Sequence, residues 1–289
     1  MVLVSATGFG TLAIFAKVGY AAGLGTEQTL AFRFGLAAAG MWALALMTGQ
    51  NPFRLGSRTL CVLAALGFVV YTAQSLTYFI ALRSLPASLV VLIAYIYPTL
   101  VVAAGWLFLR RRVSIWHGIA LVASFLGVAM LVGGAHFQLA WALVFAFASP
   151  TIYTGYILIG ERVMSSSPAV ASSAVIMSGA ALAFCILAAF QHQLALPQNT
   201  TGWVVAVGIA FFPTMLAISL FLAGLPRIGA ARSALLSTWE PVVTVSLAVL
   251  LLGDRLSLVQ VAGGVFVLLA VVLVQVAHLW SPGAPSALK

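Results

Sequence analysis

The chain has 289 residues, of which 63% are hydrophobic and 6% are charged, with a formal net charge of +9. A soluble globular domain carries about 25% charged residues, so this composition excludes that class and indicates an integral membrane protein. The basic residues are scattered at the ends of apolar blocks and form no continuous aromatic and basic face, so we expect no nucleic-acid partner. The apolar blocks are long and do not alternate as the strands of a membrane barrel would. They predict an all-α protein embedded in the lipid bilayer.

Glycines, prolines and charge clusters divide the chain into ten apolar spans. Each span has close to the ~20 residues that cross a bilayer as a helix. The connections are short and leave no room for a soluble domain. The predicted spans lie near residues 3–22, 27–48, 59–82, 86–109, 115–133, 138–160, 169–190, 202–224, 229–252 and 257–279.

The basic residues predict the orientation of these spans. An even number of spans puts both termini on one side, and an excess of Lys and Arg marks the cytoplasmic side. Arg33 falls within the second span and belongs to neither side. Nine basic residues fall on the side of the termini and three on the other, so we expect cytoplasmic termini: Arg54, Arg58, Arg110, Arg111, Arg112, Arg162, Arg227, Arg232 and Lys289 against Lys17, Arg83 and Arg255.

An internal repeat relates the two halves of the chain. A shift of 143 residues aligns Pro98 with Pro241 and the Arg-x-Ser turn that begins at Arg112 with the one that begins at Arg255, without a gap. This offset spans five helices, an odd number, so the second copy must enter the bilayer from the opposite side. We therefore predict two inverted five-helix repeats, residues 1–137 and 138–289. Inverted repeats of this kind are typical of secondary transporters.

Glu240 lies close to the centre of the ninth span, where an ionised carboxylate costs at least ~2.5 kcal/mol on insertion scales. It belongs to a stripe of polar side chains at i, i+4, i+7 and i+11, with Ser233, Ser237 and Thr244, that face one direction. Pro241 follows it and frees a backbone carbonyl in mid-helix. Two interpretations are open: a functional carboxylate that faces a cavity, or a structural one that is hydrogen-bonded to Ser or Tyr in a packed interior.

Polar aromatic residues form further stripes at mid-span. Tyr71, Gln74 and Tyr78 share a helix face in the third span, and Ser149, Tyr153 and Tyr156 share one in the sixth. Tyr and Trp usually occupy the membrane interfaces, so these positions predict an aromatic-walled cavity, although tyrosines that are hydrogen-bonded between packed helices would give the same pattern. The candidate substrate contacts are Gln74, Tyr78, Tyr97, Tyr153, Tyr156, Ser237, Trp239 and Glu240. The candidate hinges are Pro98, Pro150, Pro213 and Pro241.

Signatures of enzymes and metal sites are missing from the sequence. It contains no H-E-x-x-H and no G-x-S-x-G motif, and Asp254 is its one aspartate, so an aspartyl dyad cannot be built. Its histidines lie near span ends without the spacing of metal ligands. We expect no catalytic residue, no metal and no cofactor, and therefore no enzyme; the histidines are His117, His136, His192 and His278.

Several short motifs resemble a known family. L-P-A-S at 85–88, Y-P at 97–98 and R-V-S at 112–114 resemble the EamA repeat of the drug/metabolite transporter superfamily, and R-F at 33–34 resembles its second helix. The second copy resembles the repeat more closely, with E-P at 240–241, L-L-G-D-R-L-S at 251–257 and Gly263. The first copy departs from it, because Arg110 and Arg111 stand where the second has Gly253 and Asp254.

This resemblance implies ten helices in two inverted bundles and the export of a small organic metabolite across a bacterial inner membrane. Among subfamilies, the aromatic lining looks most like the YddG-type exporters of aromatic amino acids. The leading hypothesis is an efflux carrier that moves aromatic or other apolar amino acids by alternating access at a central cavity. The alternatives are a multidrug or cationic-compound exporter of the same fold and a non-transporting membrane enzyme or scaffold. The sequence leaves the exact substrate, proton coupling and the oligomeric state open.

Overall fold

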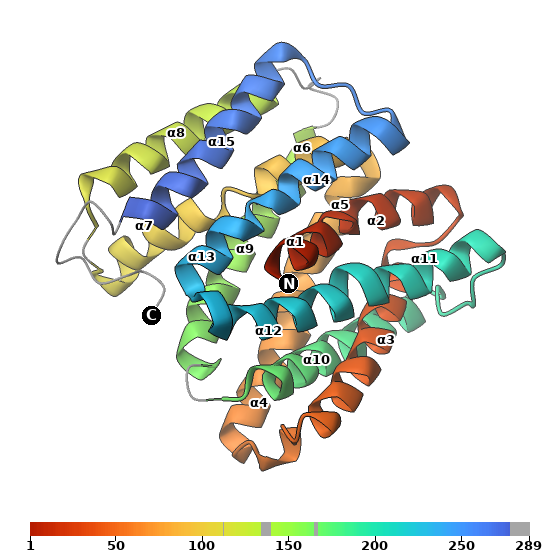
Figure 1. Ribbon diagram of the computed structural model, residues 1–289. Helices are drawn as coiled ribbons and strands as arrows, with labels where there is room; N and C mark the ends of the chain where they lie inside the picture. The colour runs from red at the N-terminus through yellow and green to blue at the C-terminus, as the bar shows by residue number, and fades with distance from the viewer. Residues whose placement is uncertain (112, 134–139, 165–166, 278–289) are drawn as a thin grey trace.

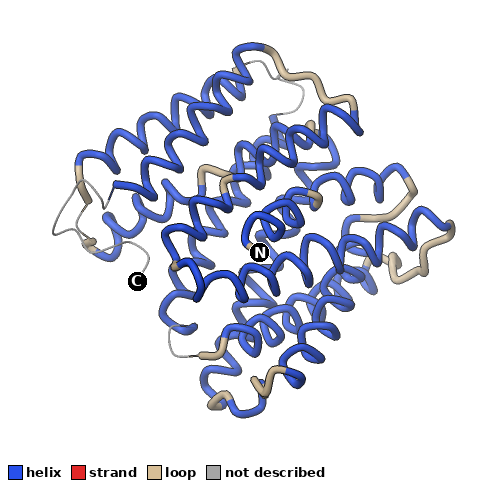
Figure 2. Tube along the Cα trace, viewed as in Figure 1, coloured by secondary structure: helices blue, strands red, loops and turns tan. Residues whose placement is uncertain are grey.

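The computed structural model describes residues 1–111, 113–133, 140–164 and 167–277, and these residues form helices and loops without a strand (Figures 1 and 2). Ten helical stretches in the described residues are long and apolar enough to cross a membrane. Their ends agree with the predicted spans to within four residues. The predicted fold class, an all-helical protein with ten candidate membrane spans, is confirmed.

Spans 1 to 5 contain eight α-helices and one π-helical segment. Span 1 is divided at Thr11, span 3 contains the π-helical segment, and span 4 is divided just before Pro98. The helices of these spans are α1 (Val2–Gly10), α2 (Leu12–Ala21), α3 (Thr26–Met47), α4 (Ser57–Ala65), η2 (Leu66–Tyr71), α5 (Thr72–Ser84), α6 (Ala87–Ala94), α7 (Tyr97–Leu109) and α8 (Ile115–Val132); a short 3₁₀ turn, η1 (Pro52–Arg54), precedes α4.

Spans 6 to 10 contain seven α-helices and two π-helical segments. Spans 8 and 9 carry the π-helical segments, and span 9 is divided just before Pro241. The helices are α9 (Ala140–Met164), α10 (Ala169–Phe190), α11 (Thr200–Ala210), η4 (Phe211–Leu216), α12 (Ala217–Ile228), α13 (Ala230–Ser237), α14 (Trp239–Leu247), η5 (Ala248–Leu252) and α15 (Leu258–Val276).

Two helix ends that lie 143 residues apart have the same geometry. After α7, Arg110 adopts φ 52° and the Arg111 N–H donates to the Gly105 carbonyl at 3.1 Å. After η5, Gly253 adopts φ 70° and the Asp254 N–H donates to the Ala248 carbonyl at 3.1 Å. A left-handed residue that closes a helix is usually glycine, because a Cβ atom there crowds the backbone. Arg110 therefore holds a conformation that Gly253 adopts without cost.

Substitutions at these two positions test whether a side chain in the left-handed conformation strains the helix end. We expect Arg110→Gly to raise the free energy of unfolding by about 1 kcal/mol and Gly253→Ala to lower it by a similar amount, because the left-handed conformation penalises a Cβ atom. The apparent Tm of each purified variant in detergent measures the effect. Opposite shifts agree with the prediction, and shifts of the same sign contradict it.

The most extensive helix pairs are α3 with α10 and α8 with α15, which run side by side in Figure 1. Backbone contact at small residues makes the second pair possible. A Cβ atom on Gly127 would lie 2.7 Å from the Gly263 carbonyl oxygen, and one on Gly263 would lie 2.6 Å from the Gly127 carbonyl oxygen. Small residues bring membrane helices together in this way without a hydrophobic driving force.

A methyl group at this crossing should separate the two helices. We expect Gly127→Ala to destabilise the protein by about 1–3 kcal/mol, because the added atom overlaps backbone atoms that cannot move aside. Gly118→Ala is the control on the same helix, since nothing lies within 4 Å of its Cβ position. The control should leave the apparent Tm unchanged or raise it, and an equal loss in both variants would show that the crossing is not the cause.

Candidate functional site

Glu240 is hydrogen-bonded across the centre of the bundle. The Tyr95 hydroxyl lies 3.0 Å from the Glu240 Oε2 atom and 2.8 Å from the Ser237 carbonyl oxygen. Tyr95 is buried, with 6% of its surface exposed, and stands at the break between α6 and α7. Ser237 is the last residue of α13, directly before the break at Thr238. The interrupted fourth and ninth spans therefore meet at this hydrogen-bonded group.

Pro241 explains why the Ser237 carbonyl needs a partner. A proline has no N–H, so it leaves the carbonyl four residues earlier without its helical hydrogen bond. Tyr95 supplies the missing donor from the neighbouring span. The hydroxyl has one hydrogen, so when it donates to Ser237 the contact with Glu240 needs a hydrogen from the carboxyl group. The arrangement thus accommodates a neutral Glu240, and an ionised Glu240 competes with Ser237 for the same hydrogen.

A continuous series of aromatic contacts begins at Tyr95. Successive ring centroids lie 6.0 Å apart from Tyr95 to Tyr97, 4.9 Å from Tyr97 to Tyr153 and 5.6 Å from Tyr153 to Tyr156. The series continues with 5.0 Å from Tyr156 to Tyr71. Tyr97, Tyr153, Tyr156 and Tyr71 are each half-buried, although they belong to spans that pack on one another inside the bundle. We call these five residues the tyrosine series.

Gln74 and Tyr78 lie on α5 beside the tyrosine series. The Gln74 side chain donates from Nε2 to the Ser149 Oγ atom of α9 at 3.0 Å, which joins the third and sixth spans. Tyr78 is buried and interacts electrostatically with both Glu240 and Arg33. The structure therefore brings Gln74, Tyr78 and Glu240 into one region of the bundle, together with the tyrosines.

Arg33 is a buried cation at the other end of the tyrosine series. Its guanidinium carbon lies 4.7 Å from the ring centre of Phe34, which in turn is 5.4 Å from Tyr71. The Nε–H donates to Thr214 Oγ1 in η4 at 3.1 Å. Only 4% of Arg33 is exposed. None of the four acidic side chains, all of which the structure describes, lies within 4.0 Å of its nitrogens.

Other candidate residues are placed differently. Trp239 is 46% exposed and makes no ring contact with the tyrosine series in the described part of the chain. In the predicted stripe, Thr244 donates to the Gly10 carbonyl, and the buried Ser233 hydroxyl has no partner among the described residues. Ser237 donates from its hydroxyl to the Ser233 carbonyl.

The four candidate hinge prolines have different surroundings. Pro98 and Pro241 each follow a helix break within three residues. Pro213 lies inside the π-helical segment η4. Pro150 lies within the uninterrupted helix α9, where its carbonyl accepts a hydrogen bond from the Thr154 hydroxyl. Helix breaks and π-helical turns are the positions where spans 4, 8 and 9 depart from regular hydrogen bonding.

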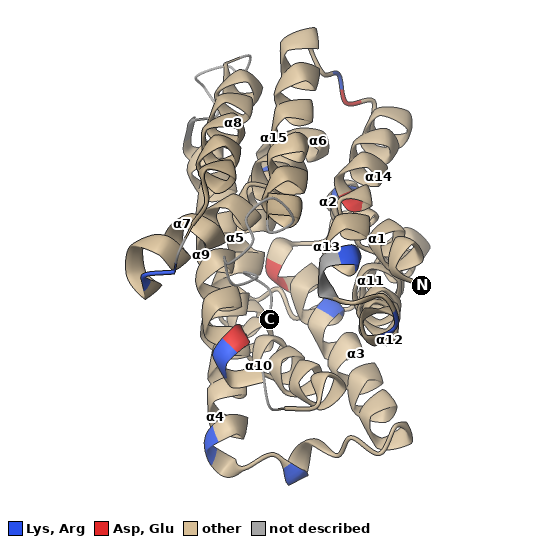
Figure 3. Ribbon diagram, turned by 60° about the vertical axis from the view of Figure 1, so that its left-hand side comes forward, with Lys and Arg blue, Asp and Glu red and all other residues tan. Residues whose placement is uncertain are grey.

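Charged groups lie mainly at the ends of the bundle. Figure 3 shows most of the ribbon without charge, with basic and acidic segments concentrated at helix ends and loops. Arg111 pairs with Glu161 at 2.9 Å, and Asp254 accepts from the Ser88 N–H and hydroxyl at 2.9 and 2.7 Å. The described residues contain no group of three His, Cys, Asp or Glu side chains arranged to hold a metal ion. These charges hold helix ends together outside the central group.

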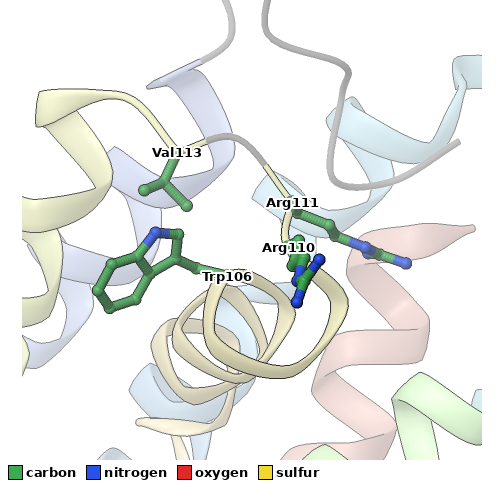
Figure 4. Close-up of a pocket in the computed structure, with 4 residues that line it drawn as sticks. All are labelled: Trp106, Arg110, Arg111 and Val113. Carbon is green, nitrogen blue, oxygen red and sulfur yellow. The ribbon is translucent and has the colours of Figure 1, made fainter.

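A surface pocket of ≈ 480 Å³ lies after the end of α7 and is separate from this central group. Trp106, Arg110, Arg111 and Val113 line it. Figure 4 shows the Trp106 and Val113 side chains facing one another, with Arg111 extending away from them. None of the tyrosines lines this pocket.

Known proteins match this chain along almost its full length. The sequence matches the EamA-like transporter family twice, over residues 1–133 and 140–276. The chain belongs to the EamA-like transporter family. Similar proteins in Bacillus subtilis (strain 168) are the uncharacterized transporter YcbK, 26% identical over 91% of this chain and 88% of YcbK, and the uncharacterized transporter YyaM, 24% identical over 85% and 83%.

A solved crystal structure has the same fold as this EamA-family chain, with a TM-score of 0.66, 20% identity and coverage of 96% of both chains. This likeness concerns the fold alone. The family and the relatives identify a multi-pass membrane transporter, which agrees with the predicted superfamily and with the transport class. The names of the family and of the relatives specify no substrate.

Tyr95 and Arg33 are central residues of this EamA-family chain that are missing from the candidate contacts predicted from the sequence. The repeat favours Tyr97, which directly precedes Pro98 as Glu240 precedes Pro241, whereas in the structure Tyr95 makes the hydrogen bonds. One feature of the sequence could have indicated Tyr95. Pro241 leaves the Ser237 carbonyl without its helical hydrogen bond, so a side chain of another span must supply a donor. Arg33 could have been recognised because a cationic side chain in mid-span is energetically costly and needs polar partners.

Proposed function

We propose that this protein exports aromatic or other apolar amino acids by alternating access, with the substrate bound beside the tyrosine series and Glu240. The observation that carries the proposal is the hydrogen-bonded group of Tyr95, Ser237 and Glu240 at two helix breaks, bordered by half-buried aromatic rings. Broken spans near the membrane midplane are where transporters of this general kind bind substrates. The YddG-type exporters of aromatic amino acids remain the proposed subfamily because of this lining.

Two inverted five-helix repeats, residues 1–137 and 138–289, form part of the proposal. The two family matches support it, and so does the shared geometry of the helix ends at Arg110 and Gly253. The packing partners also correspond: α1 packs on α12 and α14, and α9 packs on α5 and α7. In the repeat, spans 1, 8 and 9 are the counterparts of spans 6, 3 and 4. We propose that the halves rock about the central group, with cytoplasmic termini in a bacterial inner membrane.

The proposed site has a binding part and a moving part. The breaks at Pro98 and Pro241 and the π-helical turn at Pro213 give spans 4, 9 and 8 points at which they bend, and Pro150 is a weaker candidate because α9 is continuous there. The proposed substrate contacts are Gln74, Tyr78, Tyr97, Tyr153, Tyr156, Ser237, Trp239 and Glu240.

Transport by the purified protein tests this function. Proteoliposomes that contain it should exchange labelled phenylalanine, tyrosine or tryptophan faster than empty vesicles, with saturable kinetics. Equal flux in both preparations would contradict the substrate class. Competition by quaternary ammonium compounds, without competition by amino acids, would favour the cationic-compound exporter instead.

A further inference from the structure

The surface pocket at the end of α7 has an apolar side and a basic side. Trp106 and Val113 lie on one side of it, and Arg110 and Arg111 lie on the other (Figure 4). Its volume of ≈ 480 Å³ falls within the range of about 300–1,000 Å³ that is usual for small-molecule sites. The pocket lies where the apolar stretch of span 4, Ala87–Leu109, ends. Tryptophan is enriched at this level of membrane proteins, where lipid tails give way to headgroups.

The two arginines of the pocket differ in their partners. Arg111 donates from Nη2 to the Glu161 carboxylate at 2.9 Å, and its stem lies over Gly105, where an added Cβ atom would come within 3.2 Å of the Arg111 Cδ atom. Arg110 is exposed and makes no hydrogen bond or ion pair with any described residue. Glu161 therefore neutralises Arg111, while the positive charge of Arg110 remains available to an anion in the pocket.

The backbone of Arg110 is an independent sign that its side chain has a role. Its φ of 52° lies in the left-handed region, and Gly253 occupies the corresponding helix end in the second half. An arginine in this conformation lowers stability relative to glycine. Backbone strain of this kind concentrates at ligand sites and functional sites. The strained position and the unpaired guanidinium thus point to the same residue.

An exposed apolar stripe leads away from the pocket along α8. Its four members follow i, i+4, i+7 and i+11 spacing, so they share one helix face, and each of them is between 46% and 73% exposed. They are Ile115, Ile119, Val122 and Leu126. The stripe begins two residues after Val113, which lines the pocket. The pocket and the stripe together offer one surface for a charged head and one for a hydrocarbon tail.

We infer that this surface binds an anionic glycerophospholipid, with its phosphate at Arg110, its glycerol region between Trp106 and Val113, and an acyl chain along the stripe of α8. The planar guanidinium fork matches two phosphate oxygens. With the termini in the cytoplasm, as proposed, this end of span 4 faces the cytoplasmic leaflet, which carries the negative surface potential. The site is separate from the tyrosine series, so the inference does not depend on the proposed function.

A comparison of three ligands tests the chemistry of the site. The full chain is purified in detergent and titrated with phosphatidylglycerol, with the zwitterionic phosphatidylcholine, or with glycerol 3-phosphate, and the apparent Tm is recorded. We expect phosphatidylglycerol to stabilise the protein at concentrations at least about tenfold lower than phosphatidylcholine, because the choline group opposes the charge of Arg110. Equal effects of the two lipids would overturn the inference. An equal effect of glycerol 3-phosphate would assign the pocket to free phosphate esters and overturn the lipid assignment.

Arg110→Gly is the most informative variant, since its two effects have opposite signs. Without lipid the apparent Tm should rise, because the left-handed strain is removed. The concentration of phosphatidylglycerol that gives half-maximal stabilisation should nevertheless rise at least about tenfold, because the phosphate loses its charged partner. Arg110→Gln removes the charge but keeps a side chain at this φ, so it should show the loss of lipid binding without the gain in Tm. Wild-type lipid dependence in both variants would contradict the inference.

Arg58→Gln is the matched control. This arginine is exposed in the first turn of α4, on the predicted cytoplasmic side, and lies outside the pocket. The control should keep the wild-type response to phosphatidylglycerol. A loss equal to that of Arg110→Gln would mean that lipid is attracted by the basic side of the protein as a whole, which would overturn the assignment to the pocket.

Native mass spectrometry distinguishes a lipid from a second copy of the chain on the α8 stripe. We expect wild-type protein to retain phosphatidylglycerol as an adduct of one chain, and Arg110→Gln to lose that adduct under the same conditions. A dimer that carries no phosphatidylglycerol would show that another chain covers the stripe, and the inference would then be wrong.

Discussion

Phenylalanine exchange should fall at least tenfold when Glu240 is replaced by Gln, with the fold retained. The Gln side chain has nearly the shape of the carboxyl group that it replaces, but it carries no charge for an ammonium group, and its amide meets the Tyr95 hydroxyl differently from a carboxyl group. A hydrogen bond to a charged group contributes about 1.5–3 kcal/mol, which corresponds to roughly 10-fold to 150-fold in affinity. Initial rates of counterflow over a range of phenylalanine concentrations measure the loss.

The same variant separates substrate recognition from proton coupling. Loss of phenylalanine binding would assign Glu240 to recognition. Retained exchange together with loss of the pH dependence of net transport would assign it to coupling, because the carboxyl group is then the proton carrier. Wild-type behaviour in both assays would contradict any functional role. The apparent Tm must be measured in parallel, since a structural carboxyl group would show its loss there.

The sequence was sufficient to predict the spans because each depends on local composition. A stretch of about 20 apolar residues between polar ends has few alternatives to a membrane helix, so its ends could be placed to within four residues. The break in span 9 could also be anticipated, since Pro241 cannot donate a backbone hydrogen bond. Pro150 gave the same signal, yet α9 continues through it without a break. A proline predicts a missing hydrogen bond, and the packing around it decides whether the helix divides.

The partners within the site could not be predicted in the same way. Tyr95 and Glu240 are 145 residues apart, and no local pattern states that span 4 lies against span 9. The tyrosine stripes predicted which side chains share a helix face, but not the order in which the rings contact one another. Arg33 illustrates the limit most clearly. The cost of a cation in mid-span is visible in the sequence, but its hydrogen-bond partner Thr214 lies 181 residues away in a π-helical turn of span 8.

Replacing Tyr95 by Phe should lower both stability and transport. The change removes the hydroxyl that serves Glu240 and the Ser237 carbonyl, and leaves that carbonyl without a donor beside a helix break. An unsatisfied buried acceptor costs about 1–3 kcal/mol, so we expect a clear drop in the apparent Tm. Exchange of phenylalanine should slow as well, because the carboxyl group loses the contact that orients it.

Tyr97→Phe is the control for this prediction, since Tyr97 meets Tyr95 and Tyr153 through its ring and Phe preserves that shape. A double-mutant cycle then tests the shared hydrogen bond. Tyr95→Phe and Glu240→Gln should be non-additive by at least ~0.5 kcal/mol, because either change alone disturbs the same contact. The pair Tyr97→Phe and Glu240→Gln should be additive. Additivity in both cycles would mean that Tyr95 stabilises only the helix break at Ser237 and does not position Glu240.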